Sequence, residues 1–96
     1  MYERAVKLAN PSGLHARPAR VFAEAATTLD VPVIVAKGDV EIEAGSVLSL
    51  LTLDARHGDT ITLRAEGDGA EAAVDELASL VESGLGESDA PAGDSG

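Results

Sequence analysis

The chain turns at residues 10–20, which read Asn10-Pro11-Ser12-Gly13-Leu14-His15-Ala16-Arg17-Pro18-Ala19-Arg20. Turn residues are followed by a histidine and then by an apolar run with helical spacing, a pattern that predicts a strand turning sharply into a helix. His15 is therefore predicted to lie at or beside a helix N-cap. Backbone N–H groups there lack intrahelical acceptors and the helix dipole is positive, so the position suits a group that carries or receives an anion.

Three side chains of this stretch suit phosphoryl chemistry. Imidazole is nucleophilic and neutral near pH 7, so His15 can accept a phosphoryl group. The planar guanidinium of Arg17 matches phosphate oxygens. Pro18 is tolerated in a first helical turn, because its missing N–H would have no partner there. The alternative is a surface or capping histidine without chemistry, the more common situation for an isolated histidine near a helix start.

The run Ser12-Gly13-Leu14-His15-Ala16-Arg17-Pro18-Ala19 resembles the active-site signature of the HPr family, the histidine-containing phosphocarriers of the phosphoenolpyruvate-dependent sugar phosphotransferase system. This resemblance implies that Nδ1 of His15 accepts a phosphoryl group from enzyme I and passes it to a sugar-specific enzyme II A component. It also implies that Arg17 stabilises the phosphate and that the backbone N–H groups of Ala16 and Arg17 cap it. The protein would then be a stoichiometric carrier and not an enzyme, with no cofactor and no metal.

Other functions stay open at this point. An HPr-like protein can also donate phosphoryl groups to a dedicated pathway, such as dihydroxyacetone phosphorylation, or act mainly as a regulatory binding partner. A small α/β binding module without phosphate chemistry is a third possibility, which the clustering of His15, Arg17 and Arg20 disfavours. Phosphorylation by enzyme I would separate this third possibility from the others.

Composition limits the class of protein. The 96 residues suffice for one small domain, and the absence of cysteine removes disulfides and thiolate metal sites from consideration. No apolar run approaches ~18 residues and no basic-then-apolar leader precedes the chain, which predicts a cytoplasmic protein without membrane insertion. Acidic residues number 17 against 7 basic ones, so the net charge of −10 makes nucleic acid an unsuitable partner. The acidic, aromatic-poor composition also predicts a halophilic protein, because concentrated salt screens self-repulsion.

Hydrophobic periodicity predicts seven elements. The expected strands cover residues 2–8, 31–36, 40–44 and 60–65, and the second and third of them form a hairpin in which Val40, Ile42 and Ala44 face inward. The expected helices cover residues 16–29 and 47–53, followed by a third that runs from an Asp68–Glu71 capping box to Ser83 and has Gly84 as its C-cap.

The order βαββαβα, with one-faced strands and one-faced helices, predicts an α/β (α+β) open-faced sandwich. Its four-stranded antiparallel sheet would carry three helices on one face, and the HPr family has this architecture. Residues 1–86 form the expected domain, and residues 87–96 are expected to be a disordered acidic tail.

The second expected helix holds more apolar residues than one helix face can bury. Either it is nearly all core or part of it is an exposed binding patch. The resemblance implies a surface around His15 that docks both phosphate donor and acceptor, and it includes Leu14, Arg20, Val47, Leu48 and Leu51. We expect the carrier to be a monomer.

Ser46 precedes this helix and is predicted to be its N-cap. It also resembles the serine that HPr kinase phosphorylates in many Gram-positive bacteria, where phosphorylation turns HPr into a regulator of carbon catabolite repression. Gly45 stands where those regulated proteins usually carry lysine, so the cap is the favoured interpretation. His57 falls in a polar loop and is expected to be a solvated turn residue.

Overall fold

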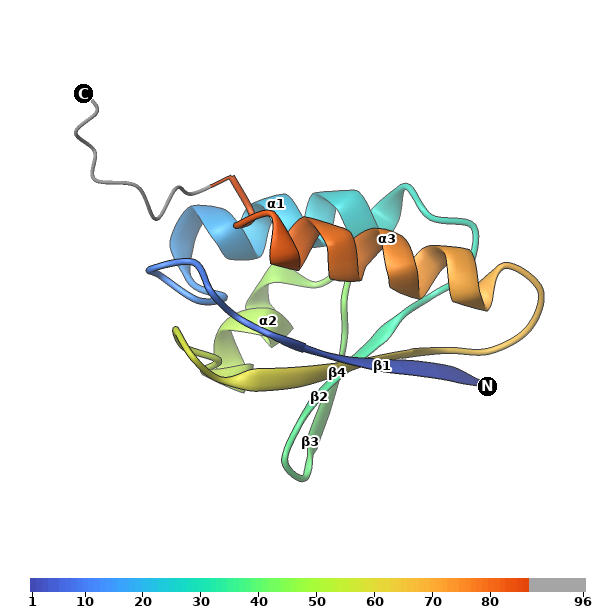
Figure 1. Cartoon of the computed structure of the whole chain (residues 1–96), viewed down its shortest axis with the longest axis horizontal. Coiled ribbons are helices and arrows are strands. Elements are labelled where there is room, and N and C mark those ends of the chain that lie inside the picture. Colours follow the sequence, from blue (N-terminus) through green and yellow to red (C-terminus); the bar gives the residue numbers. More distant parts are fainter. Residues whose placement is uncertain (87–96) are drawn as a thin grey trace.

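One antiparallel sheet with the strand order β1-β4-β2-β3 organises the computed structural model, which describes residues 1–86. The strands are β1 (Tyr2–Lys7), β2 (Ile34–Lys37), β3 (Val40–Glu43) and β4 (Thr60–Ala65). The helices are α1 (Ala16–Thr27), α2 (Val47–Leu53) and α3 (Ala70–Glu82). They cover one face of the sheet, with α1 and α3 side by side (Figure 1), so the predicted βαββαβα open-faced sandwich is confirmed.

The central strand β4 separates a dry face of the sheet from a wet one. Residues that face the helices are buried and alternate with residues on the open face, the first set being Ile61, Leu63 and Ala65 and the second Thr60, Thr62 and Arg64. On the open face, Arg64 Nε donates to Glu3 on β1 and Arg64 Nη1 donates to Glu41 on β3, both at 2.8 Å. One arginine therefore links three strands across the open face.

The helices close over the sheet with apolar faces. Phe22 of α1 is fully buried. It lies in one continuous core that includes residues in or next to each of the four strands and residues from each helix. The third helix buries a regular helical stripe, whose members are Ala70, Ala73, Val74, Leu77, Ala78 and Val81. Burial of such side chains contributes roughly 1.5–3 kcal/mol for each large one, which makes this stripe the main anchor of α3.

Arg4 lies on the helix-facing side of β1, where the sequence pattern expects an apolar residue. Its guanidinium extends past the core to α3, with Nη1 3.2 Å from Asp75 Oδ1 and Nη2 3.0 Å from Glu82 Oε2. The side chain thus covers apolar surface with its stem and keeps its charge paired at the edge.

The start of α3 differs from the prediction. Its N-cap is Gly69, with φ of 88°, and no side chain caps it, so the predicted capping box at Asp68 is wrong. The left-handed backbone at Gly69 moves the helix start past Asp68, whose carboxylate then lies outside the first turn.

The helix ends at Glu82, and Gly84 follows its C-cap with φ of 99°. Leu85 N donates to Leu80 O at 3.1 Å, which closes the end as in a Schellman motif.

Two other boundaries are shorter than predicted. The first helix ends at Thr27, because the hydroxyls of Thr27 and Thr28 donate to carbonyls of the last turn and Thr28 is the C-cap. The hairpin of β2 and β3 is confirmed, but β2 begins only at Ile34. Val40 is 48% exposed instead of buried, because β3 is an edge strand and the hairpin end extends away from α1 and α3 (Figure 1).

No helix within residues 1–86 is long and apolar enough to cross a bilayer. The predicted disordered tail, residues 87–96, lies outside the described residues.

Candidate functional site

The candidate site lies where the loop after β1 meets the loop before β4. Lys7 pairs with Thr60 in the β1–β4 register, so both loops leave the same end of the sheet. Three backbone hydrogen bonds then join the loops, from Leu8 N to Asp59 O at 2.8 Å, from Gly58 N to Leu8 O at 2.7 Å and from Leu14 N to Ala55 O at 2.9 Å. Residues 54–59 therefore support the turn that carries His15.

Gly13 is the point of closest approach between the two loops. Its φ of 61° lies in the left-handed region that favours glycine. A Cβ atom at this position would lie 2.5 Å from Ala55 O and 2.6 Å from Arg56 Cα, closer than atoms can pack. A side chain at residue 13 would thus push the turn before His15 away from its support.

Asn10 and His57 add side-chain contacts to the same junction. The Asn10 side chain is buried and donates from Nδ2 to Gly13 O at 2.9 Å. His57 is exposed in its turn, as expected, but its Nδ1 also lies 3.1 Å from Asn10 O. Because a carbonyl oxygen only accepts, this contact requires a proton on Nδ1.

His15 is the N-cap residue of α1, as the sequence predicts, with φ of −129° and ψ of 158°. Its side chain is 36% exposed and makes no capping hydrogen bond. Nδ1 lies 3.1 Å from Ser12 O, and Nε2 lies 3.2 Å from Oδ1 of Asp54. Both partners are acceptors, so a neutral ring can hydrogen-bond to only one of them, and a doubly protonated ring to both.

Asp54 is a site residue that the sequence analysis missed. Arg56 donates to both of its carboxylate oxygens, with Nε 3.2 Å from Oδ1, the oxygen that His15 also contacts, and Nη2 3.2 Å from Oδ2. These hydrogen bonds, with a smaller contribution from His15, lower the pKa of the Asp54 carboxyl, so it is ionised at neutral pH. The available sequence signal is weak, since the acid and the arginine simply follow the second helix as Asp54-Ala55-Arg56.

Arg17 differs from the other arginines of the chain. The guanidinium groups of Arg4, Arg20, Arg56 and Arg64 each pair with a carboxylate. Arg17 is exposed and has no ion-pair partner within residues 1–86. Arg20, one turn further on, is bound to Glu24 at 3.1 Å. The cation next to His15 is therefore available to an anion, whereas Arg20 must leave Glu24 first.

The first turn of α1 is also suited to an anion. It contains no acidic residue, and the His15 side chain leaves its backbone N–H groups uncapped. Ala16 has φ of 53°, a left-handed value that is unfavourable for a residue with a Cβ atom. The structure thus places backbone strain and uncapped N–H groups directly beside the histidine.

The apolar part of the predicted docking surface is exposed only on α2, and Arg20 is exposed on α1. Val47, Leu48 and Leu51 are 36%, 76% and 39% exposed, and the helix that carries them ends at Asp54 beside His15. Leu14 is fully buried in the core cluster, so its assignment to this surface is wrong. The hydrogen bond from Leu14 N to Ala55 O fixes the backbone of Leu14 against the second loop, and the Leu14 side chain is buried in the core.

Ser46 caps α2 as predicted. Its Oγ accepts from Ser49 N at 3.2 Å. Ser46 and Asp54 lie at opposite ends of this seven-residue helix. The cap is therefore about two helical turns away from the end that lies beside His15.

Within residues 1–86 no group of three or more histidine, cysteine, aspartate or glutamate side chains is placed to hold a metal ion. The fold and the site instead define a class of small α/β proteins, open-faced sandwiches that present one partly exposed histidine at the N-terminus of their first helix.

Comparisons with known proteins agree with this class. Residues 2–83 match the family model described as "PTS HPr component phosphorylation site". The chain belongs to the HPr family of phosphocarrier proteins. It is 48% identical to phosphocarrier protein HPr of Streptomyces coelicolor over 88 residues, which cover 91% of this chain and 95% of the relative.

Other relatives extend the range of sources. The chain is 41% identical to phosphocarrier protein NPr of Shewanella violacea, covering 83% of this chain and 88% of the relative. It is 40% identical to phosphocarrier protein HPr of Haloferax volcanii, covering 82% and 91% respectively. Among solved structures, HPr-C-His from Thermoanaerobacter tengcongensis superposes with a TM-score of 0.86 at 35% identity, covering 92% of this chain and 99% of that one.

Proposed function

We propose that this protein is a stoichiometric phosphoryl carrier of the phosphotransferase system and that Nδ1 of His15 is the acceptor. The observation that carries the proposal is the placement of a partly exposed histidine at an uncapped helix N-terminus, with an unpaired arginine two residues further on. Uncapped N–H groups and a free guanidinium both stabilise a dianionic phosphoryl group.

Transfer would proceed between two imidazoles. The lone pair of His15 Nδ1 attacks the phosphorus of a phosphohistidine on the donor, whose other ring nitrogen carries a proton, and the donor's P–N bond breaks. The electron pair of that bond returns to the donor imidazole, which leaves as a neutral ring. Because nucleophile and leaving group are the same kind of group, the step can run in either direction, as a carrier requires.

The proposed donor is enzyme I and the proposed acceptor is an enzyme II A component. The exposed side chains Val47, Leu48 and Leu51 would dock both partners, and Arg20 would contribute at the edge of the same surface. An apolar patch beside an anion-handling centre favours protein partners, since a small molecule would need a concave pocket around His15. The carrier would act as a monomer.

A second candidate is a carrier for a dedicated or regulatory pathway. The similarity to phosphocarrier protein NPr, which extends over 83% of this chain, supports this candidate. In either case His15 takes the phosphoryl group, and only the identity of the accepting protein differs.

The test is phosphorylation of the purified protein by phosphoenolpyruvate and enzyme I. One phosphoryl group should be gained, labile in acid and stable in base, as a phosphoramidate is and a phosphoserine is not. His15→Ala should abolish the gain, and His57→Ala is the matched control that should retain it. Phosphate on the His15→Ala protein, or none on the parent with any enzyme I tested, would overturn the proposal.

A further inference from the structure

We infer that Asp54 is a positioning residue for His15, holding the imidazole with its proton on Nε2 so that the lone pair lies on Nδ1. This inference rests on the proposed function, since it concerns the same histidine. It starts from the distance of 3.2 Å between Nε2 and Asp54 Oδ1, across 39 positions of sequence.

Three parts of the fold hold Asp54 in place, two through its backbone and one, Arg56, through its carboxylate. Asp54 follows α2 as the C-cap residue, with φ of 53° and ψ of 42°. Arg56 donates a hydrogen bond to each carboxylate oxygen at 3.2 Å, and Lys37 Nζ donates to the Asp54 backbone carbonyl at 2.8 Å. A carboxylate restrained from the helix, the loop and β2 can orient a ring, whereas a freely rotating surface aspartate cannot.

The two contacts of His15 compete for one proton when the ring is neutral. A proton on Nδ1 would be donated to the Ser12 carbonyl, and a proton on Nε2 would be donated to the Asp54 carboxylate. A hydrogen bond to a charged acceptor is roughly twice as strong as one to a neutral acceptor, so the Nε2–H form is favoured. The lone pair on Nδ1 then faces the Ser12 carbonyl oxygen, so this contact is not a hydrogen bond and only the Nε2 bond to Asp54 holds the ring.

The same arrangement supports the charge that transfer creates. When the Nδ1 lone pair forms a bond to phosphorus, the Nε2 proton stays on the ring, and the ring becomes a cationic phosphoimidazolium. The Asp54 carboxylate lies against the N–H of that cation. When the phosphoryl group leaves, the electron pair of the P–N bond returns to Nδ1 and the ring is neutral again.

A carboxylate near a phosphoryl group would ordinarily repel it. Here the contact is made at Nε2, on the opposite edge of the ring from Nδ1, and Arg56 supplies a compensating positive charge on the same carboxylate. Arg17 lies free on the α1 side, and Lys37 binds Asp59 at 3.1 Å. Within residues 1–86, the carboxylates of Asp54 and Asp59 are thus each paired with a cation.

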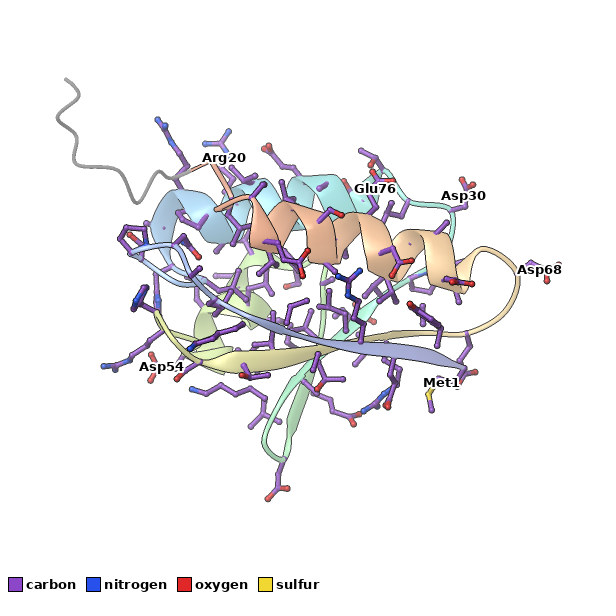
Figure 2. All side chains as sticks on the ribbon, in the orientation of Figure 1. Met1, Arg20, Asp30, Asp54, Asp68 and Glu76 are labelled. Carbon is purple, nitrogen blue, oxygen red and sulfur yellow. The ribbon has the colours of Figure 1, made fainter. Side chains whose placement is uncertain are left out.

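Two substitutions separate the charge of Asp54 from its shape. Asp54→Asn keeps an acceptor oxygen and removes the charge, while Asp54→Gly removes the side chain at a position whose φ of 53° suits glycine. Asp68→Asn is the control with the same change in net charge, because Figure 2 places Asp68 at the end of the molecule opposite Asp54. Far-ultraviolet circular dichroism should show that all three variants are folded.

The first measurement needs no phosphate donor. In alkaline buffer, long-range proton–nitrogen NMR spectra report the fraction of His15 with its proton on Nε2. We expect this fraction to fall from parent to Asp54→Asn and further to Asp54→Gly, while His57, bound to the Asn10 carbonyl, and the Asp68→Asn protein stay unchanged. An unchanged fraction in Asp54→Gly overturns the inference, whether or not His15 is ever phosphorylated.

The second measurement is the rate of phosphoryl transfer from enzyme I. Loss of a hydrogen bond to a charged group should slow transfer by roughly tenfold in Asp54→Gly and by less in Asp54→Asn. A tautomer shift with transfer at the parent rate would also overturn the role assigned to Asp54. Failure of the parent to accept any phosphate instead refutes the proposed function and leaves the tautomer result to stand by itself.

Discussion

The N-termini of α1 and α2 meet the same requirement in opposite ways. Ser46 caps α2 with its own Oγ, which accepts from Ser49 N at 3.2 Å. His15 occupies the same position in α1 and makes no capping bond, because its ring is turned to the Ser12 carbonyl and to Asp54. An absent N-cap costs about 1 kcal/mol, and the strained φ of 53° at Ala16 adds to that cost.

The two helix ends thus differ in local stability, and the less stable one is the N-terminus of α1. At α2 the local sequence satisfies the helix end, so the element is complete by itself. At α1 the helix end is left open to an anion, and the loop of residues 54–59 holds it in place instead. We therefore expect changes at the α1 end to act through tertiary contacts or phosphoryl transfer, and changes at the Ser46 cap of α2 to act on local stability alone.

The largest expected effect is on the support of the α1 end. Gly13→Ala should lower the free energy of unfolding by roughly 2–5 kcal/mol, because a left-handed φ and a clash with Ala55 O add together. Gly38→Ala is the control, since its φ of 60° is nearly the same but no atom lies within 4 Å of the added Cβ. That control should lose roughly 1–2 kcal/mol. Urea unfolding measures both, and equal losses would contradict the close approach at Gly13.

A smaller effect is expected from the free guanidinium at the α1 end. Arg17→Ala should slow transfer from enzyme I by about tenfold to 100-fold, because a hydrogen bond to a charged group contributes ~1.5–3 kcal/mol. Arg20→Ala should have a weaker effect, since Arg20 is already paired with Glu24. Rapid-quench transfer kinetics give both rates. A larger loss in Arg20→Ala than in Arg17→Ala would reverse these assignments.

The smallest expected effect is at the α2 end. Ser46→Ala should lower the free energy of unfolding by about 1 kcal/mol through loss of the cap, with little change in transfer. Ser79→Ala, at an exposed position inside α3, is the matched control and should be neutral or slightly stabilising because alanine favours helix interiors. Thermal unfolding and transfer rates measured on the same samples test this. A transfer rate that falls strongly in Ser46→Ala would show that Ser46 has a role beyond the cap.

The sequence by itself determined the elements, their order and the position of His15. Alternating apolar residues in β4, the helical stripe of α3 and the Ser46 cap depend on neighbours a few positions away, so periodicity and turn chemistry predict them. The same holds for the histidine at the start of α1. Local prediction was less accurate at boundaries, as at Asp68, where one glycine with a positive φ moved the helix start.

Only the tertiary structure decided how the site is completed. The pairing of Lys7 with Thr60 brings two loops to one end of the sheet, and this pairing places Asp54 against His15. The burial of Leu14 follows from the same junction, because its backbone is tied to Ala55. Such contacts join residues about 40 positions apart and depend on strand order and register, which no local pattern along the chain encodes.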